Sequence, residues 1–127
     1  MDWQEWAHDF ENIEPDEFAG LFAQGGLFCD PVTPWTTDVQ GVADQTRAIF
    51  PDWTARVDSI RSGERWAVFE WTGSATFLAD TDHSVAVTVH GATIVEVDDH
   101  DKVTRWRDYL DTNEPMRQIK GAVAPSS

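Results

Sequence analysis

The chain is poor in the residues and segments that point to several common classes of protein. Its only cysteine, Cys29, can form no internal disulfide, and its four histidines show no zinc-binding spacing. No stretch approaches 18 consecutive apolar residues, and the first residues lack the basic and apolar regions of a signal peptide. We therefore expect a soluble, cytoplasmic protein with no bound metal.

Basic residues are also scarce. Nine Lys and Arg stand against 23 Asp and Glu, which gives a formal net charge of -14. Residues 1–46 contain ten of the acidic residues and no Lys or Arg. Because this charge repels phosphate backbones and anionic membranes, it argues against a nucleic-acid partner and a membrane partner.

Sequence motifs for phosphate and dinucleotide binding are missing as well. The chain contains no phosphate-binding glycine loop, no G-x-G-x-x-G and no G-x-S-x-G of the serine hydrolases. Aromatic residues, by contrast, make up 12% of the chain, with seven Trp, seven Phe and one Tyr. Such rings suit a core or an apolar pocket. Because the motifs are missing, we expect a site that uses no cofactor.

Hydrophobic spacing predicts helices in the first half of the chain. Apolar residues recur at helical spacing over residues 3–13, and a second helix is expected from Pro15 to the Gly25-Gly26 pair. The short apolar run 27–30 is followed by a predicted loop to Gly41. Residues 42–50 then have the pattern of a third helix.

The second half has the pattern of strands separated by turn signals. The predicted strands are 54–61, 65–78, 84–97 and 102–111. Helices followed by long antiparallel strands predict a single α+β domain over residues 1–120, in which the helices cover one face of the sheet. Residues 121–127 have little to bury and are expected to be a disordered tail.

Asp108 is the first candidate for chemistry. In the last predicted strand, alternation with a period of two places it on the same face as Trp106 and Leu110. A carboxylate between apolar neighbours loses hydration, which raises its pKa and suits a general acid or base. The pattern leaves open a structural role, in which Asp108 accepts hydrogen bonds that hold the sheet to a helix.

Two further polar residues have open interpretations. In strand 84–97 the odd positions are mostly valine, which predicts a buried odd face, yet the even face with His90 is hardly polar either. His90 is therefore a core residue or a catalyst. Asp30, before Pro31, either stabilises the following loop or lies at the rim of a pocket with Trp35 as its lid.

Several segments together resemble SnoaL-like proteins of the nuclear transport factor 2-like superfamily. The similarity covers roughly residues 3–119, and Trp106-Arg107-Asp108-Tyr109 is its most specific part. Related epoxide hydrolases keep an acid/base aspartate in a similar segment, and polyketide cyclases keep a comparable carboxylate. The other matching segments are Leu27–Pro31, Gly41-Val42, Pro51–Trp53, Trp66–Trp71 and His90-Gly91. The resemblance implies a cone of three N-terminal helices on a strongly curved, mostly antiparallel sheet, with an internal pocket.

The chain departs from the limonene-epoxide-hydrolase-like relatives at several positions. The resemblance implies an Arg and a second Asp at two positions of the preceding long strand, where this chain has Trp71 and Gly73. It implies Tyr and Asn at two further positions, where this chain has Phe28 and Asp30. These departures disfavour plain epoxide hydrolysis. The same resemblance turns His90 towards the cavity, beside Asp108, and such a His–Asp pair resembles cyclase or isomerase chemistry.

These observations predict a cofactor-independent acid/base enzyme for a small apolar cyclic, polyketide-like or terpenoid-like molecule. Its reaction would be that of a cyclase, an isomerase or a dehydratase-type lyase. Asp108 would move the proton, His90 would act on the substrate oxygen, and Asp30 is a third catalytic candidate. The expected substrate-binding residues are Phe28, Trp35, Trp71, Thr88, Trp106 and Leu110. Two alternatives are a non-catalytic ligand-binding or dimerisation module and an atypical epoxide hydrolase; a homodimer is expected.

Overall fold

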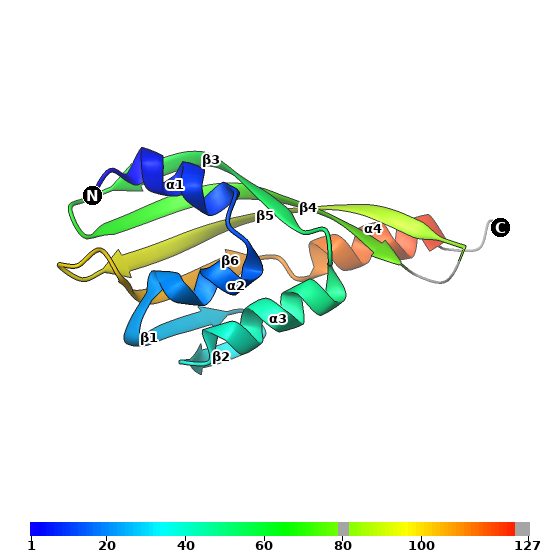
Figure 1. The fold of residues 1–127 in the computed structure, drawn as a ribbon. Coiled ribbons are helices and arrows are strands. Elements are labelled where there is room, and N and C mark those ends of the chain that lie inside the picture. The colour runs from blue at the N-terminus through cyan, green and yellow to red at the C-terminus, as the bar shows by residue number, and fades with distance from the viewer. Residues whose placement is uncertain (79–81, 124–127) are drawn as a thin grey trace.

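The computed structural model describes residues 1–78 and 82–123 and contains four helices, a short 3-10 turn and six strands in this part of the chain (Figure 1). In chain order these are α1 (Trp3–Glu11), α2 (Pro15–Phe18), the 3-10 turn (Ala19–Leu21), β1 (Phe22–Asp30), β2 (Thr33–Thr36), α3 (Val39–Ile49), β3 (Thr54–Ser62), β4 (Trp66–Leu78), β5 (Ser84–Val97), β6 (Val103–Leu110) and α4 (Asn113–Val123). None of these helices is long and apolar enough to cross a membrane.

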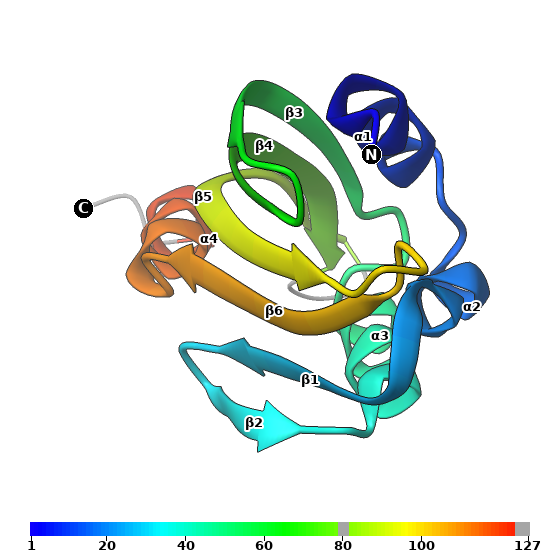
Figure 2. The same cartoon turned by 90° about the vertical axis from the view of Figure 1, so that its left-hand side faces the viewer.

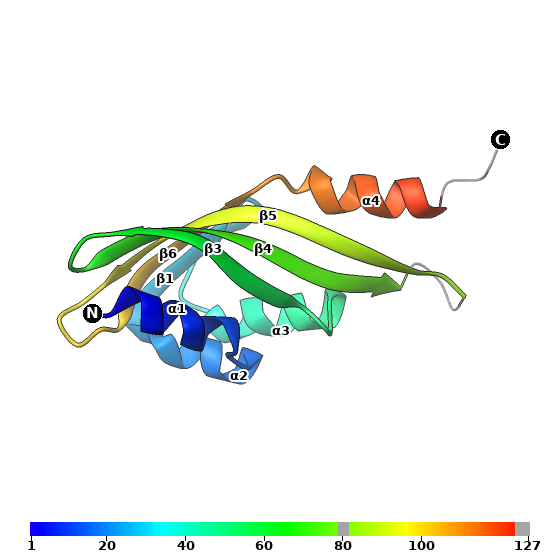
Figure 3. The same ribbon diagram turned by 90° about the horizontal axis from the view of Figure 1, so that it is seen from above.

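The strands form one mixed sheet in the order β2-β1-β6-β5-β4-β3. Only the β1–β6 pair is parallel, and Figure 2 shows these two strands side by side. Helices α1, α2 and α3 lie on one face of the sheet and α4 lies on the other (Figure 3). We call these the inner and the outer face. The α+β class and the mostly antiparallel sheet are confirmed, whereas the cone and its pocket stay predictions.

The N-terminal prediction was wrong in one respect, the length of the second helix. The helix α2 ends at Phe18, and the strand β1 already begins at Phe22. Gly25, predicted to help stop the helix, has φ +76° within this strand, and the register with β6 shifts between Phe22 and Leu27. Because glycine accepts positive φ without strain, the glycine pair forms an irregularity in a strand rather than a helix end.

The other boundaries follow the sequence more closely. The predicted strands from residue 54 onward are each confirmed to within a residue or two. The predicted loop 31–41, however, contains the short strand β2 and the start of α3, where Asp38 Oδ1 accepts the Gly41 N–H at 3.1 Å. The helix α4 was not predicted. It takes up residues 121–123 of the expected tail, and residues 124–127 lie outside the described residues.

Aromatic rings fill the inner face at one end of the sheet. The ring of Trp106, which is 2% exposed, has five aromatic neighbours at centroid distances of 5.1 to 6.2 Å. These neighbours are Trp6, Phe10, Phe18, Phe22 and Phe69. Tilted and edge-to-face arrangements of this kind add to the free energy gained by burying the rings. The apolar spacing of the first helix is thus explained by its packing on the sheet.

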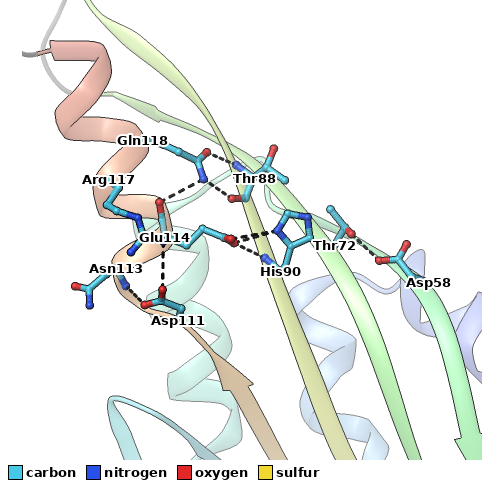
Figure 4. A network of polar contacts seen from close by, with 9 residues as sticks. All are labelled: Asp58, Thr72, Thr88, His90, Asp111, Asn113, Glu114, Arg117 and Gln118. Atoms are coloured by element: carbon cyan, nitrogen blue, oxygen red, sulfur yellow. Dashed lines mark hydrogen bonds and ion pairs between the residues drawn. The ribbon is translucent and has the colours of Figure 1, made fainter.

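Where β5 extends beyond its neighbour β6, side chains of α4 take the place of a further strand. The β5–β6 pairing begins at Gly91, so the backbone of Thr88 and His90 has no strand on that side. Glu114 Oε1 accepts the His90 N–H at 2.6 Å, and the Gln118 amide bonds to both the N–H and the C=O of Thr88 at 2.8 and 2.7 Å (Figure 4). Because an open strand edge leaves polar backbone groups unpaired, these bonds hold α4 on the outer face.

Candidate functional site

Asp108 lies on the inner face, as its sequence pattern predicted. The preceding Trp106 is buried, Asp108 and Leu110 are partly buried, and Arg107 and Tyr109 between them are exposed on the outer face. The register pairs Asp108 with Thr93 of the neighbouring strand β5. The carboxyl group therefore sits among apolar and aromatic side chains at the centre of the sheet.

One oxygen of this carboxyl, Oδ1, receives two hydrogen bonds. The Thr93 hydroxyl donates to it at 2.6 Å and the Trp106 indole N–H donates to it at 2.8 Å. The indole N–H of Trp71 in turn donates to the Thr93 hydroxyl oxygen at 2.9 Å. Thr93 is fully buried. Residues of three adjacent strands, β4, β5 and β6, are thus linked by hydrogen bonds that end at Asp108 Oδ1.

The other oxygen, Oδ2, has no hydrogen-bond partner among the described residues. Every fully buried side-chain nitrogen or oxygen in this part of the chain does have a partner. It follows that Oδ2 is not fully buried and keeps contact with solvent. Asp108 therefore has one oxygen, Oδ2, that makes no hydrogen bond within the described part of the chain.

Burial raises the pKa of Asp108 from 3.8 to about 6. Loss of hydration is the main cause, and the negative charge of Asp30 adds to it; the hydrogen bonds from Thr93 and Trp106 act in the opposite direction. A carboxyl group with this pKa exists in both protonation states near neutral pH. That is the property required of a group that both accepts and returns a proton.

Asp30 lies on the strand next to Asp108. The parallel register aligns Cys29 with Arg107, which places Asp30 beside Asp108. Asp30 Oδ1 also accepts the Val32 N–H at 2.9 Å, so the predicted role of stabilising the loop is confirmed. Its charge nevertheless acts on Asp108, and its place at the rim of a pocket stays a prediction.

The prediction that His90 adjoins Asp108 was wrong. His90 lies on the outer face, its side chain is 65% exposed, and its Nδ1 is 3.2 Å from Glu114 Oε2 (Figure 4). Thr88 is exposed on the same face and contacts Gln118 through its backbone, so it does not line the inner face either. The hydrophobic alternation of β5 gave the correct orientation, and the family resemblance gave the wrong one.

Trp35 also lies away from Asp108. Its ring centroid is 4.5 Å from the guanidinium carbon of Arg105, which projects from the outer face, so Trp35 is not a lid over the inner face. Phe28 is 3% exposed and packs against Phe18 at 6.3 Å in the aromatic core. Of the predicted wall residues, the structure therefore brings Trp71 and Trp106 into direct hydrogen-bonded connection with the Asp108 site.

Two hollows on the surface lie away from Asp108. One, of about 250 Å³, lies between α1 and β3, and another, of about 410 Å³, lies beside β2 and α3. Neither is lined by Asp108. In the described part of the chain, no group of three or more His, Cys, Asp and Glu could hold a metal ion.

Sequence reasoning missed Thr93, although a signal for it was present. The buried odd positions of β5 carry Val85, Val87, Val89, Val95 and Val97, and Thr93 is the polar exception among them. A hydroxyl in such a run needs a buried partner, and Asp108 is the polar residue of the neighbouring strand on the same face. The pair could have been inferred from these two exceptions together.

Residues 3–106 match the family model of the SnoaL-like domain. The chain belongs to the SnoaL-like domain family. No curated protein sequence matches it. Among solved structures, a protein with a ketosteroid isomerase-like fold from Catenulispora acidiphila, in complex with trimethylamine, is 17% identical with a TM-score of 0.76, over 89% of this chain and 87% of that one.

Two further solved structures with the SnoaL-like fold carry names of enzymes. A polyketide cyclase candidate from Acidithiobacillus ferrooxidans is 19% identical with a TM-score of 0.74, over 94% of this chain and 92% of that one. An LEH-like epoxide hydrolase from M. tuberculosis is 17% identical with a TM-score of 0.66, over 97% and 92% of the two chains. At these identities the comparisons show the nuclear transport factor 2-like fold.

Proposed function

We propose that this SnoaL-like protein is a cofactor-independent acid/base enzyme in which Asp108 moves a proton on a small, largely apolar organic molecule. The observation that carries the proposal is the state of its carboxyl group. One oxygen is held by two donors, the other is free, and burial raises the pKa to about 6. The inner face offers aromatic and aliphatic surface around it, which suits an apolar ligand.

Because His90 lies on the outer face, it is not available as a second acid or base beside Asp108. Asp30 lies beside Asp108 but already accepts the Val32 N–H, so in the simplest scheme the Asp108 carboxyl itself accepts a proton and later returns it. In such a step on a β,γ-unsaturated ketone, Asp108 Oδ2 takes a proton from the carbon between the carbonyl group and the C=C bond, and the electrons of the broken C–H bond form a dienolate. The neutral carboxyl then returns the proton to the far carbon of the former C=C bond, which leaves the double bond conjugated with the carbonyl group. This sequence is an isomerisation, which we favour over cyclisation and dehydration.

Structural relatives support this proposal only at the level of the fold. Their names include a ketosteroid isomerase-like fold with bound trimethylamine and a polyketide cyclase candidate, so the same architecture accompanies small organic molecules and proton chemistry. The epoxide hydrolase relative keeps hydrolysis as an alternative. Trp71 and Gly73, which stand where the resemblance expects charged residues, make that alternative the weaker one.

Proton abstraction can be tested before the natural substrate is known. A panel of cyclic ketones is incubated with the protein in D2O, and incorporation of deuterium beside the carbonyl is followed by NMR. We expect exchange above the buffer rate, and we expect Asp108→Asn to reduce it by at least ~100-fold, the range typical of a lost general base. His90→Gln is the matched control and should exchange at the wild-type rate. Equal rates for Asp108→Asn and wild type would contradict the proposal.

A second candidate function, self-association, is supported by the outer face. Trp66, Ile94 and Tyr109 are 47%, 39% and 45% exposed there, on the adjacent strands β4, β5 and β6. The basic residues of this patch, Arg105 and Arg107, are balanced by Glu70 and Glu96. In a chain of net charge -14, a second copy meets the least repulsion at such a neutral patch.

We therefore propose that the chain forms a homodimer through the outer face. Aromatic and arginine side chains around an apolar centre are typical of protein interfaces. Light scattering of the eluting protein should give a dimer for wild type and a monomer for Ile94→Asp. Ile49→Asp, at the 49% exposed end of α3, is the matched control and should remain dimeric. A monomeric wild type, or a dimeric Ile94→Asp, would contradict this interface.

A further inference from the structure

The hydrogen bonds that end at Asp108 can run in one direction only. An indole N–H donates and cannot accept, so the Thr93 oxygen accepts from Trp71. The single hydroxyl proton of Thr93 is then free to be donated, and it points to Asp108 Oδ1. Trp106 is also a pure donor to the same oxygen. Among the described residues the Thr93 hydroxyl has no acceptor other than Asp108 Oδ1, so the two indoles and this carboxyl oxygen together set the polarity of the chain of bonds.

This polarity decides where Asp108 can carry a proton. Two donor hydrogens already point at Oδ1, at donor–oxygen distances of 2.6 and 2.8 Å, so a proton bound there would face both of them. Oδ2 has no donor among the described residues and keeps contact with solvent. The neutral acid therefore carries its proton on Oδ2, and the carboxylate keeps the same orientation after the proton leaves.

We infer that Trp71 and Thr93 are positioning residues which, acting through Oδ1, make Oδ2 of Asp108 the atom that exchanges the proton with the ligand. This inference rests on the proposed acid/base function of Asp108. Thr93 contacts the carboxyl directly, and Trp71 acts through Thr93. Neither residue needs to touch the ligand for this role.

The position of Trp71 is itself fixed by its surroundings. The side chain is 7% exposed, and its ring meets that of Trp53 edge to face at a centroid distance of 6.0 Å. Gly91 of β5 lies under the ring, and a Cβ atom at that position would overlap it. Because the indole is packed on both sides, its N–H stays directed at Thr93. Gly91 is therefore part of what holds the chain of hydrogen bonds together.

The inference is tested on the titration of Asp108 itself, without a substrate. Carbon-13 NMR of the aspartate carboxyl groups gives the pKa, and the Asp108 signal is identified by its loss in Asp108→Asn. Thr93→Val keeps the shape of the side chain but removes the donor, so we expect the proton affinity of Asp108 to rise about tenfold. Thr93→Ser should restore the wild-type value. Trp71→Phe should give a smaller rise, because the Thr93 hydroxyl remains.

Thr88→Val is the matched control, since Thr88 is on the same strand but exposed on the outer face. It should leave the titration of Asp108 unchanged. The deuterium exchange rate should fall in Thr93→Val and recover in Thr93→Ser, which a purely structural loss of packing would not produce. If Thr93→Val does not fold, Thr93→Ser and Trp71→Phe still test the order of effects.

Two different failures can be told apart. An unchanged titration in both Thr93→Val and Trp71→Phe, with exchange still dependent on Asp108, would overturn the positioning role alone. Exchange that is independent of Asp108 would overturn the proposed function, whatever the titrations show. A rise in proton affinity in Thr93→Ser as large as that in Thr93→Val would also contradict the inference, because the hydroxyl is the group said to act.

Discussion

The inner and the outer face of the sheet each contain an aspartate with a threonine donor at the same distance. Thr93 donates to Asp108 at 2.6 Å on the inner face, and Thr72 donates to Asp58 at 2.6 Å on the outer face. A second donor is present in both, Trp106 at 2.8 Å and Arg56 at 2.9 Å. Yet the pKa of Asp108 is raised to about 6, whereas the Thr72 and Arg56 hydrogen bonds hold the pKa of Asp58 below 3.8.

Hydration explains the difference between the two pairs. Asp58 is exposed, so water stabilises its charge and the hydrogen bonds lower its pKa further. At Asp108 the loss of water outweighs two good hydrogen bonds. The same donor at the same distance therefore belongs to a carboxyl group with a raised pKa on one face and to an ordinary surface carboxylate on the other. A chemical function is indicated by the environment of the pair and not by the pair itself.

The largest effect is expected from removing the titration of Asp108. Between pH 4 and 6 the folded protein holds a proton on Asp108 that the unfolded chain has released, so rising pH lowers the free energy of unfolding through this window. The shift from 3.8 to about 6 corresponds to about 3 kcal/mol. In Asp108→Asn this loss should be absent. The free energy of unfolding of the variant, taken relative to that of wild type, should therefore be higher at pH 8 than at pH 4.

The measurement is urea unfolding of wild type and variant at both pH values. Asp58→Asn is the control on the outer face, and it should not flatten the pH dependence, since the pKa of Asp58 is lowered and its contribution is lost only on acidification below pH 4. Parallel pH profiles of wild type and Asp108→Asn would show that ionisation of Asp108 does not destabilise the folded protein. The difference inferred between the inner and the outer aspartate would then be contradicted.

The next largest effect concerns the stability that is lost when the hydroxyl of Thr93 or that of Thr72 is removed. Thr93→Val leaves the Trp71 indole N–H without a partner in the interior and the Asp108 carboxyl with the Trp106 indole as its remaining donor, which should cost about 1–3 kcal/mol in the free energy of unfolding. Thr72→Val removes an equally short bond on the outer face, where water can replace it. We expect its unfolding midpoint in urea to stay close to that of wild type. Equal losses in the two variants would show that burial does not distinguish them.

The strands were predictable because their alternation extends over many residues. In β5 the valines at odd positions identified the inner face, and in β6 the same pattern placed Asp108 there. The glycine pair at 25 and 26 was wrongly predicted to end a helix. The positive φ of Gly25 within a strand depends on the pairing with β6, which the local sequence does not show. Tertiary contacts also decide the end of the second helix.

Within the candidate site, the sequence predicted the place of Asp108 on the inner face but not the hydrogen bonds to its carboxyl group. The resemblance to related enzymes suggested His90, but the side chain of His90 follows the alternation of β5 to the outer face. Thr93 and the role of the Trp71 N–H depend on the register of three strands, which residue order does not contain. The helix α4 was not predicted, although Met116 and Ile119 have helical spacing and Ile119 is buried in the core; its bonds to β5 through Glu114 and Gln118 depend on the tertiary structure.

The smallest effect concerns this contact of α4 with the outer face. Gln118→Ala removes two hydrogen bonds to the backbone of Thr88, which are partly accessible to water, and should lower the stability of the helix–strand contact by about 1 kcal/mol. Hydrogen exchange at the Thr88 and His90 amides should accelerate, whereas exchange at the Thr93 amide, in the part of β5 paired with β6, should not change. Arg117→Ala, one position away on α4, is the control, because its side chain pairs with Asp111 and not with β5. Acceleration at Thr93 as well would mean that α4 stabilises the whole sheet, and the two faces would then be coupled rather than independent.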